Sequence, residues 1–142
     1  MVNRMNTLQT QLLADFNAES DITDEFGLID DYLREPDARL LKHELPALMF
    51  EALTCGPCSK GSYWEDIDFV TIIIVENAVI ETARSEVKRL ISLVRDFLVS
   101  DQWRWNNETQ IKESGFGIGE FDNKKFRAVG IINFTTHAHL TD

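Results

Sequence analysis

The most regular hydrophobic pattern in the chain lies in residues 66 to 77, which read DIDFVTIIIVEN. Successive side chains of an extended chain point to opposite faces, so this run places apolar residues on both faces from Phe69 onward. Its β-branched residues favour a strand over a helix, and Glu76 and Asn77 end it with turn-forming chemistry. We therefore expect a strand that is buried on both sides and paired with neighbouring strands.

Two other runs have helical spacing. Between residues 6 and 18, Leu8, Leu12 and Phe16 recur on one side, which predicts an amphipathic helix packed on the sheet. Residues 81 to 100 give the clearest helical pattern of the chain, and we expect this helix to lie across the sheet and cover the central strand. Its apolar stripe consists of Val87, Leu90, Ile91, Val94, Phe97 and Leu98.

The C-terminal part of the chain predicts a β-hairpin. Over residues 115 to 121, glycine alternates with Phe116 and Ile118, which is typical of a strand that another backbone approaches closely. Residues 122 to 125 form a polar turn, and from residue 126 apolar and polar positions alternate over a long final strand. We expect these two strands to pair with each other in an antiparallel sheet.

The segments between these elements are less regular. Residues 19 to 31 are acidic and are compatible with a loop, a short strand near residues 26 to 29, or a flexible excursion. A proline suits the first helical turn, so a short helix is predicted over residues 36 to 44. A strand is predicted to begin at Pro46. The Gly-, Ser- and Pro-rich residues 54 to 64 are interpreted as a connecting loop.

These elements predict an α+β fold, with a mostly antiparallel sheet and an N-terminal helix and one long amphipathic helix packed on one face. The 142 residues fit a single domain, residues 1 to 142. A formal net charge of −10 argues against nucleic-acid and membrane partners, because both need clustered Lys and Arg. The N-terminus does not read as a signal peptide and no stretch has the length of a membrane span, so we expect a soluble cytoplasmic protein.

The sharpest local motif is CGPC, which gives Cys55 and Cys58 the spacing of thioredoxin-like oxidoreductases. In that chemistry the first thiol lies at a helix N-terminus, which stabilises its thiolate. The context departs from the pattern, because no helix-forming run follows Cys58 and no tryptophan precedes Cys55. We favour a turn with two reduced thiols and keep a redox pair, with Cys55 as nucleophile and Cys58 as resolving thiol, as an alternative.

Other candidate sites are weaker. CxxC is half a zinc set, and the remaining candidate ligands, His137 and His139, lie on a polar face that suits a solvated strand end. Gly115, Gly117 and Gly119 do not complete a GxGxxG motif, and no Walker sequence is present. We therefore predict no catalytic, metal or cofactor site and no small-molecule substrate.

The predicted elements have a definite order along the chain. An amphipathic helix precedes a strand that opens on Leu45 and Pro46, a loop, the strand DFVTIIIVEN and the helix ETARSEVKRLISLVRDFL. A tryptophan-bearing connection then leads to a closing hairpin that ends RAVGIINFTTHAHL. This order resembles the tail terminator (tail completion or head-tail joining) proteins of long-tailed bacteriophages and prophages. The resemblance covers most of the chain and rests on element order rather than on an invariant motif.

The resemblance implies a structural virion protein rather than an enzyme. Subunits would associate head-to-tail into a closed ring of six that caps the tail tube and joins it to the head connector. The implied partners are further copies of the chain, tail-tube proteins and head-connector proteins, in the virion tail and in the host cytoplasm during assembly. No residue-level site transfers from the family. Our own hypothesis places subunit contacts in two loops, at Ser59, Lys60, Tyr63, Trp64, Asn123, Lys124 and Lys125.

Two alternatives come from other functional classes. The first is a thiol-disulfide oxidoreductase that uses the CGPC pair, in which Cys55→Ser should abolish disulfide reduction. The second is a small acidic cytosolic adaptor module whose surface meets a basic partner. Association that weakens with salt, in a protein that never forms rings, would favour the adaptor.

Overall fold

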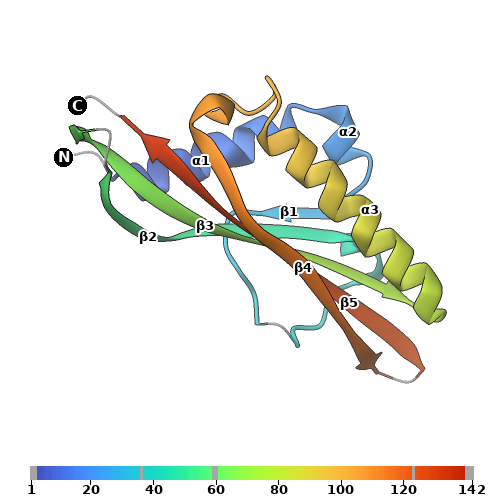
Figure 1. Ribbon diagram of the computed structural model, residues 1–142. Helices are drawn as coiled ribbons and strands as arrows, with labels where there is room; N and C mark the ends of the chain where they lie inside the picture. The colour runs from blue at the N-terminus through green and yellow to red at the C-terminus, as the bar shows by residue number, and fades with distance from the viewer. Residues whose placement is uncertain (1–2, 36, 59–60, 123, 140–142) are drawn as a thin grey trace.

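The computed structural model describes residues 3–35, 37–58, 61–122 and 124–139. Its centre is a five-stranded sheet in the order β1-β2-β3-β5-β4, with the helices on one face (Figure 1). Neighbouring strands are antiparallel except β1 and β2, which are parallel. The predicted α+β fold with a mostly antiparallel sheet is thus confirmed. The strands are β1 (Leu28–Asp30), β2 (Ala47–Cys58), β3 (Gly61–Asn77), β4 (Thr109–Phe121) and β5 (Lys125–Ala138).

Both predicted amphipathic helices are present. Helix α1 (Arg4–Asn17) begins after Asn3, whose side-chain oxygen accepts a hydrogen bond of 3.1 Å from the backbone N–H of Asn6. Helix α3 (Ile80–Leu98) buries the whole apolar stripe expected from its sequence. Among the helices of the described residues, none has the length and apolar character needed to cross a membrane.

The core lies between the helices and one face of the sheet. Phe16 of α1 stacks on Phe97 of α3 with ring centroids 4.6 Å apart, so the two helices meet over the sheet. Phe69 of β3 stacks on Phe134 of β5 at 4.8 Å. After α3, the fully buried Trp103 closes this layer. The helix-covered face is therefore continuously packed from α1 to the start of β4.

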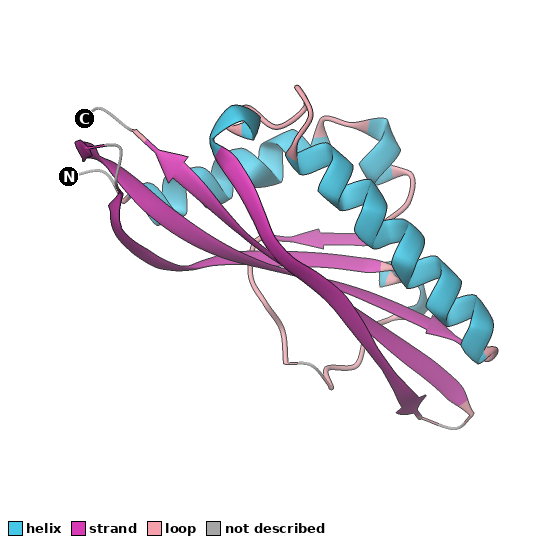
Figure 2. Ribbon diagram, in the orientation of Figure 1, coloured by secondary structure: helices cyan, strands magenta, loops and turns pink. Residues whose placement is uncertain are grey.

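The opposite face of the sheet is only partly covered. A loop over residues 31–35 and 37–46 lies on it (Figure 2), and its Leu33, Leu40 and Leu45 pack against the cluster that includes Met49 of β2 and Ile74 of β3. Ile72 of β3 packs at the border of this cluster and is half-buried, and Val70 is half-buried as well. The predicted burial of the central strand on both sides is therefore right for one face and only locally right for the other.

The predicted helix over residues 36 to 44 is wrong, apart from a three-residue 3-10 turn, η1 (Lys42–Glu44). Of the leucines in this range, Leu40 packs against the sheet while Leu41 is exposed, and this tertiary contact overrides helix propensity. Residue 36 itself lies outside the described residues. The strand expected after Pro46 is confirmed as β2.

The predicted loop over residues 54 to 64 is also wrong, because β2 and β3 run through most of it as a hairpin. Cys55 pairs with Ile67, and Pro57 pairs with Glu65. Proline is tolerated there because β1 pairs with β2 only at Ala47 to Met49, so the other edge of β2 needs no donor at Pro57. Of the alternatives for residues 19 to 31, the short strand is realised as β1, after a four-residue helix α2 (Ser20–Thr23).

Candidate interaction surface

The uncovered part of the sheet lies on β4 and β5, on the side opposite α3. The register pairs Gly115 with Ile131 and Gly117 with Val129, and side chains alternate along each strand. Residues from both strands therefore share one surface, which we call the open face. The open face consists of Glu113, Gly115, Gly117 and Gly119 of β4 and Val129, Ile131 and Asn133 of β5.

The open face is apolar and exposed at its centre. Ile131 is 41% exposed, and Val129 beside it is half-buried. A shallow hollow of about 370 Å³ is lined by residues from both strands. This small apolar surface is available for contact with another molecule. The lining residues are Glu113, Ser114, Gly115, Phe116, Gly117, Ile131 and Asn133.

The three glycines of β4 leave this surface without side chains at three positions of the strand. Within the described structure, a Cβ atom built on Gly115, Gly117 or Gly119 would have no neighbour within 4 Å beyond the adjoining residues. None of the three has a left-handed backbone conformation that would demand glycine. The fold therefore gives no steric reason for glycine at these positions.

A buried ion pair closes one end of the open face. Arg127 of β5 donates hydrogen bonds to a carboxylate oxygen of Glu76 at 3.1 Å and to the carbonyl of Ala38 at 2.9 Å. Its guanidinium carbon lies 3.6 Å from the ring centroid of Phe121. The covering loop and this cluster thus seal the sheet on the side nearest the β4–β5 turn.

Polar cross-strand pairs occupy the other end. His137 Nδ1 lies 2.5 Å from an Asp66 carboxylate oxygen. Asp68 accepts hydrogen bonds from Thr135 Oγ1 at 2.5 Å and from Thr54 Oγ1 at 2.8 Å. These hydroxyl and imidazole groups are engaged with carboxylates of the sheet itself, which is a structural arrangement of cross-strand pairs. Among the described residues, no three His, Cys, Asp or Glu side chains are grouped as a metal would need.

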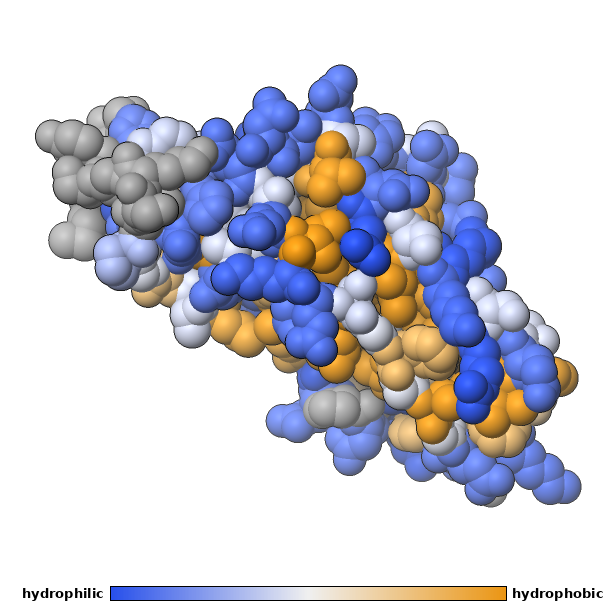
Figure 3. Space-filling model, in the orientation of Figure 1, coloured by the Kyte–Doolittle hydropathy of each residue, from blue (hydrophilic) through white to orange (hydrophobic). Residues whose placement is uncertain are grey.

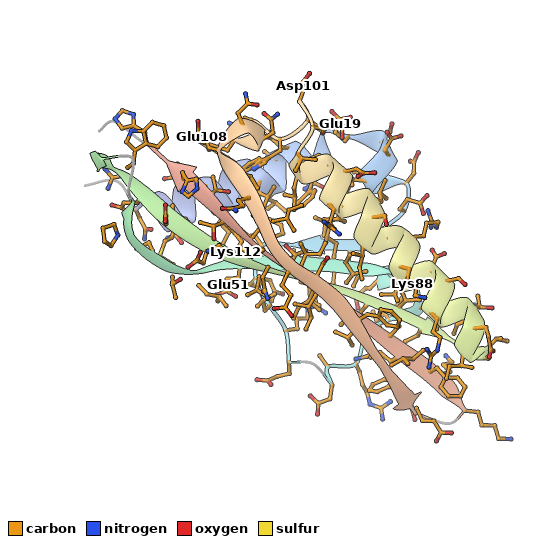
Figure 4. The ribbon with its side chains drawn as sticks, viewed as in Figure 1. Glu19, Glu51, Lys88, Asp101, Glu108 and Lys112 are labelled. Atoms are coloured by element: carbon orange, nitrogen blue, oxygen red, sulfur yellow. The ribbon has the colours of Figure 1, made fainter. Side chains whose placement is uncertain are left out.

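The β4 edge also has apolar character on its helix side. Ile111, Phe116 and Ile118 are partly buried and pack against the core. Figure 3 shows a diagonal band of hydrophobic residues in the region where β4 and α3 lie in Figure 1. Lys88 extends from α3 toward β4 (Figure 4), and its Nζ lies 5.7 Å from the ring centroid of Phe116. Both sides of β4 thus offer apolar contact at the edge of the sheet.

The structure places the CGPC residues in a strand, not at the start of a helix. Cys55 lies in β2 with an exposed thiol, and Cys58 ends that strand. The helix N-terminus that stabilises a reactive thiolate in thioredoxin-like proteins is therefore absent after Cys58, where the described backbone continues into β3.

The loop residues expected to contact other subunits fall into three groups. Ser59, Lys60 and Asn123 lie outside the described residues. Tyr63 and Trp64 belong to β3, and the Trp64 ring lies 5.2 Å from that of His139. Lys124 lies in the β4–β5 turn and Lys125 begins β5. The contact role of all seven residues stays a prediction.

Sequence reasoning found the strand that carries the open face but did not recognise the face as a site. The alternation of glycine with Phe116 and Ile118 correctly indicated a strand, and it suggested close approach by another backbone. Within the described structure no such backbone covers the open-face side of Gly115 or Gly117. That mismatch is the signal that points to a surface left open for another molecule.

No known protein-family profile matches the chain. The chain is similar to the nucleoporin NUP133 of Chaetomium thermophilum, with 40% identity over 79 residues. The match covers 53% of this chain and 6% of the nucleoporin. This chain therefore corresponds to a small part of that protein's length, too small a share to assign it to a family.

This similarity overturns the bacteriophage interpretation. A nucleoporin relative contradicts a tail terminator, a tail-capping ring, tail-tube and head-connector partners, and a location in the virion tail. It also gives no support to the thiol-disulfide oxidoreductase or to the acidic cytosolic adaptor. The error has a physical basis, because the order of helices and strands specifies a fold, and one fold serves many unrelated functions.

Proposed function

We propose that this chain is a structural, protein-binding domain without a catalytic role, and that it works inside a protein assembly as nucleoporins do. The observation that carries the proposal is the open face, an apolar and glycine-lined surface on two adjacent strands of the sheet. In a partner complex, burial of Ile131 and Val129 would contribute hydrophobic free energy at roughly 25 cal/mol for each Å² removed from water.

The charge distribution of the open face supports the same role. Between Gly115 and Gly119 on β4, and at Val129 and Ile131 on β5, no position of the face carries a charge. Charged groups are instead found at its rim, at Glu113 on one side and at the buried Arg127 pair on the other. A protein interface characteristically has this arrangement, with an apolar centre that is depleted in charge and a polar rim.

The similarity to a nucleoporin supports the choice of assembly. The proposed partners are accordingly proteins of the nuclear pore, and the proposed location is the nuclear pore itself. The domain would contribute contacts between proteins rather than chemistry on a substrate.

The proposal can be tested by proximity labelling in Chaetomium thermophilum cells that express this chain fused to a biotin ligase. We expect nucleoporins to be enriched over a ligase control, and Ile131→Asp to remove that enrichment because it places a charge at the centre of the open face. Val99→Asp is the matched control, because Val99 is 54% exposed and lies at the C-terminal end of α3. Labelling equal to the ligase control, or unaffected by Ile131→Asp, would contradict the proposal.

A further inference from the structure

The outer edge of β4 carries backbone groups that β5 leaves unpaired. In an antiparallel ladder, every second residue turns its N–H and C=O away from the neighbouring strand. β4 is the last strand in the sheet order and is 13 residues long, so it presents a long outward row of donors and acceptors. Such an edge is a ready template for a strand from another chain.

Most of this edge lacks the usual protection against pairing. Natural edges are blocked by bulges, by prolines and by lysines. In β4 the register shift lies between Ile111 and Glu113, and Lys112 lies within it, so both devices act only near the start of the strand. From Ser114 to Phe121 the pairing with β5 is regular, and this stretch contains neither proline nor lysine.

We propose that β4 accepts an extended segment of a partner protein as a sixth strand of the sheet. The segment carries an aromatic side chain over Gly115 and Gly117, against Ile131, and a Lys or Arg side chain two residues away, opposite Glu113. This inference rests on the proposed function and names the chemistry of the partner at the same surface.

The aromatic position follows from the bare glycines. The hollow of about 370 Å³ beside Gly115, Gly117 and Ile131 has room for a large side chain. An aromatic ring from a neighbouring strand can lie over a strand glycine and replace the packing that the glycine lacks. The same ring would cover Ile131, which is 41% exposed without a partner.

Charge determines two features of the proposed partner: the basic side chain opposite Glu113, and a protein other than a second copy of this chain. Glu113 lies two residues from Gly115 on the same face, so partner side chains two positions apart reach both. A second copy of this chain would bring a second net charge of −10 against the first. Self-repulsion disfavours that pairing, whereas a basic segment is electrostatically complementary.

The test uses a synthetic peptide of about nine residues, rich in threonine and valine, with phenylalanine and lysine two positions apart. Binding to the full chain is followed by NMR amide shifts and by fluorescence anisotropy. We expect shifts centred on β4 and β5. Replacing phenylalanine with glycine, or lysine with glutamate, should weaken binding. Only every second amide of the bound peptide faces β4. N-methylation of these amides should abolish binding because it removes their donors, whereas N-methylation of the other amides should not.

Protein variants separate this site from unspecific binding. Gly117→Val should weaken binding at least about tenfold, because its side chain would occupy the place of the aromatic ring. Gly56→Val is the matched control, since Gly56 is equally bare but lies in β2, and binding should stay unchanged. Glu113→Lys should weaken the lysine peptide about fivefold and strengthen the glutamate peptide.

Several results would overturn the inference. Peptide binding that is unaffected by Gly117→Val, shifts confined to other strands, or no binding at millimolar peptide would each contradict a strand site at β4. Concentration-dependent protection of β4 without peptide would show that a second copy occupies the edge instead. The peptide test does not depend on nuclear pore components, so its failure can be told apart from failure of the labelling experiment.

Discussion

Gly130 of β5 and Gly117 of β4 lie on adjacent strands of one hairpin but face opposite sides of the sheet. A Cβ on Gly130 would lie 3.0 Å from Ile91 Cδ1 and 3.1 Å from Val87 Cγ2, both on α3. A Cβ on Gly117 would have no neighbour within 4 Å in the described structure, its adjoining residues aside. The two glycines share a residue type and a strand environment, and only their neighbours differ.

The difference separates a glycine that the fold explains from glycines that it does not explain. At Gly130 it lets α3 approach the sheet closely, so the fold itself explains the residue. In β4, glycines cost stability because they lose more conformational entropy on folding and offer no side chain to pack. Because the fold gains nothing visible from Gly115 and Gly117, we attribute them to a partner that approaches from outside.

The largest change in stability is expected from a substitution on the helix-covered face. Gly130→Val should lower the free energy of unfolding by about 3 kcal/mol, because a β-branched side chain would be forced against Ile91 and Val87 in a packed core. Urea denaturation followed by circular dichroism measures this change. Gly130→Ala serves as a graded control and should cost less. A neutral Gly130→Val would mean that α3 does not rest on β5 as described.

On the open face, a larger side chain is not expected to lower the free energy of unfolding. Gly117→Val should leave the free energy of unfolding unchanged or raise it by up to about 1 kcal/mol, because valine suits a strand and meets no neighbour. The same urea experiment applies, with Gly56→Val as a second bare site. If Gly117→Val lowered stability as much as Gly130→Val, the two faces would not differ in packing as described.

The smallest effect concerns the exposed ion pair beside the covered face. Arg89 of α3 donates a 2.7 Å hydrogen bond to Glu25 and thereby lowers the pKa of that carboxyl from its ordinary value of 4.5. A carboxyl with a lowered pKa in the folded state stabilises the protein above its ordinary pKa, and this contribution is lost as pH falls below it.

The expected contribution is only a few tenths of a kcal/mol, because the side chains of Arg89 and Glu25 are 48% and 34% exposed and solvent screens the pair. Glu25→Gln should therefore reduce stability slightly at pH 7 and not at pH 3, in urea titrations at both values. If the stability difference between the unsubstituted protein and Glu25→Gln were larger at pH 3 than at pH 7, the ion pair would not stabilise the protein as described. Packing under α3, rather than such pairs, is expected to dominate the covered face.

The elements with strong periodicity were predictable from the sequence. The stripe from Val87 to Leu98 specified α3, and Leu8, Leu12 and Phe16 specified α1, because each helix buries one face. The hairpin of β4 and β5 followed from alternation and a polar turn. The errors lie where contacts between distant residues determine the structure, since Leu40, within the predicted helix over residues 36 to 44, packs on the sheet instead.

The site was only partly predictable. Alternating glycines in β4 indicated close approach by a backbone, but a sequence does not show which face of a strand a helix will cover. Only the register, with Gly117 opposite Val129 and Phe116 opposite Gly130, separates the covered glycine from the bare ones. The CGPC motif was interpreted as a turn in a connecting loop. Its residues instead form part of β2, where Cys55 pairs with Ile67 of β3 and Pro57 pairs with Glu65.

The outer edge of β4 is the proposed place for another strand. Amide hydrogen exchange along β4, measured with and without the aromatic-basic peptide, tests it most directly. We predict that alternate amides between Ser114 and Phe121, those that point away from β5, exchange more slowly when peptide is bound. Unchanged exchange of these amides in the presence of bound peptide would contradict it.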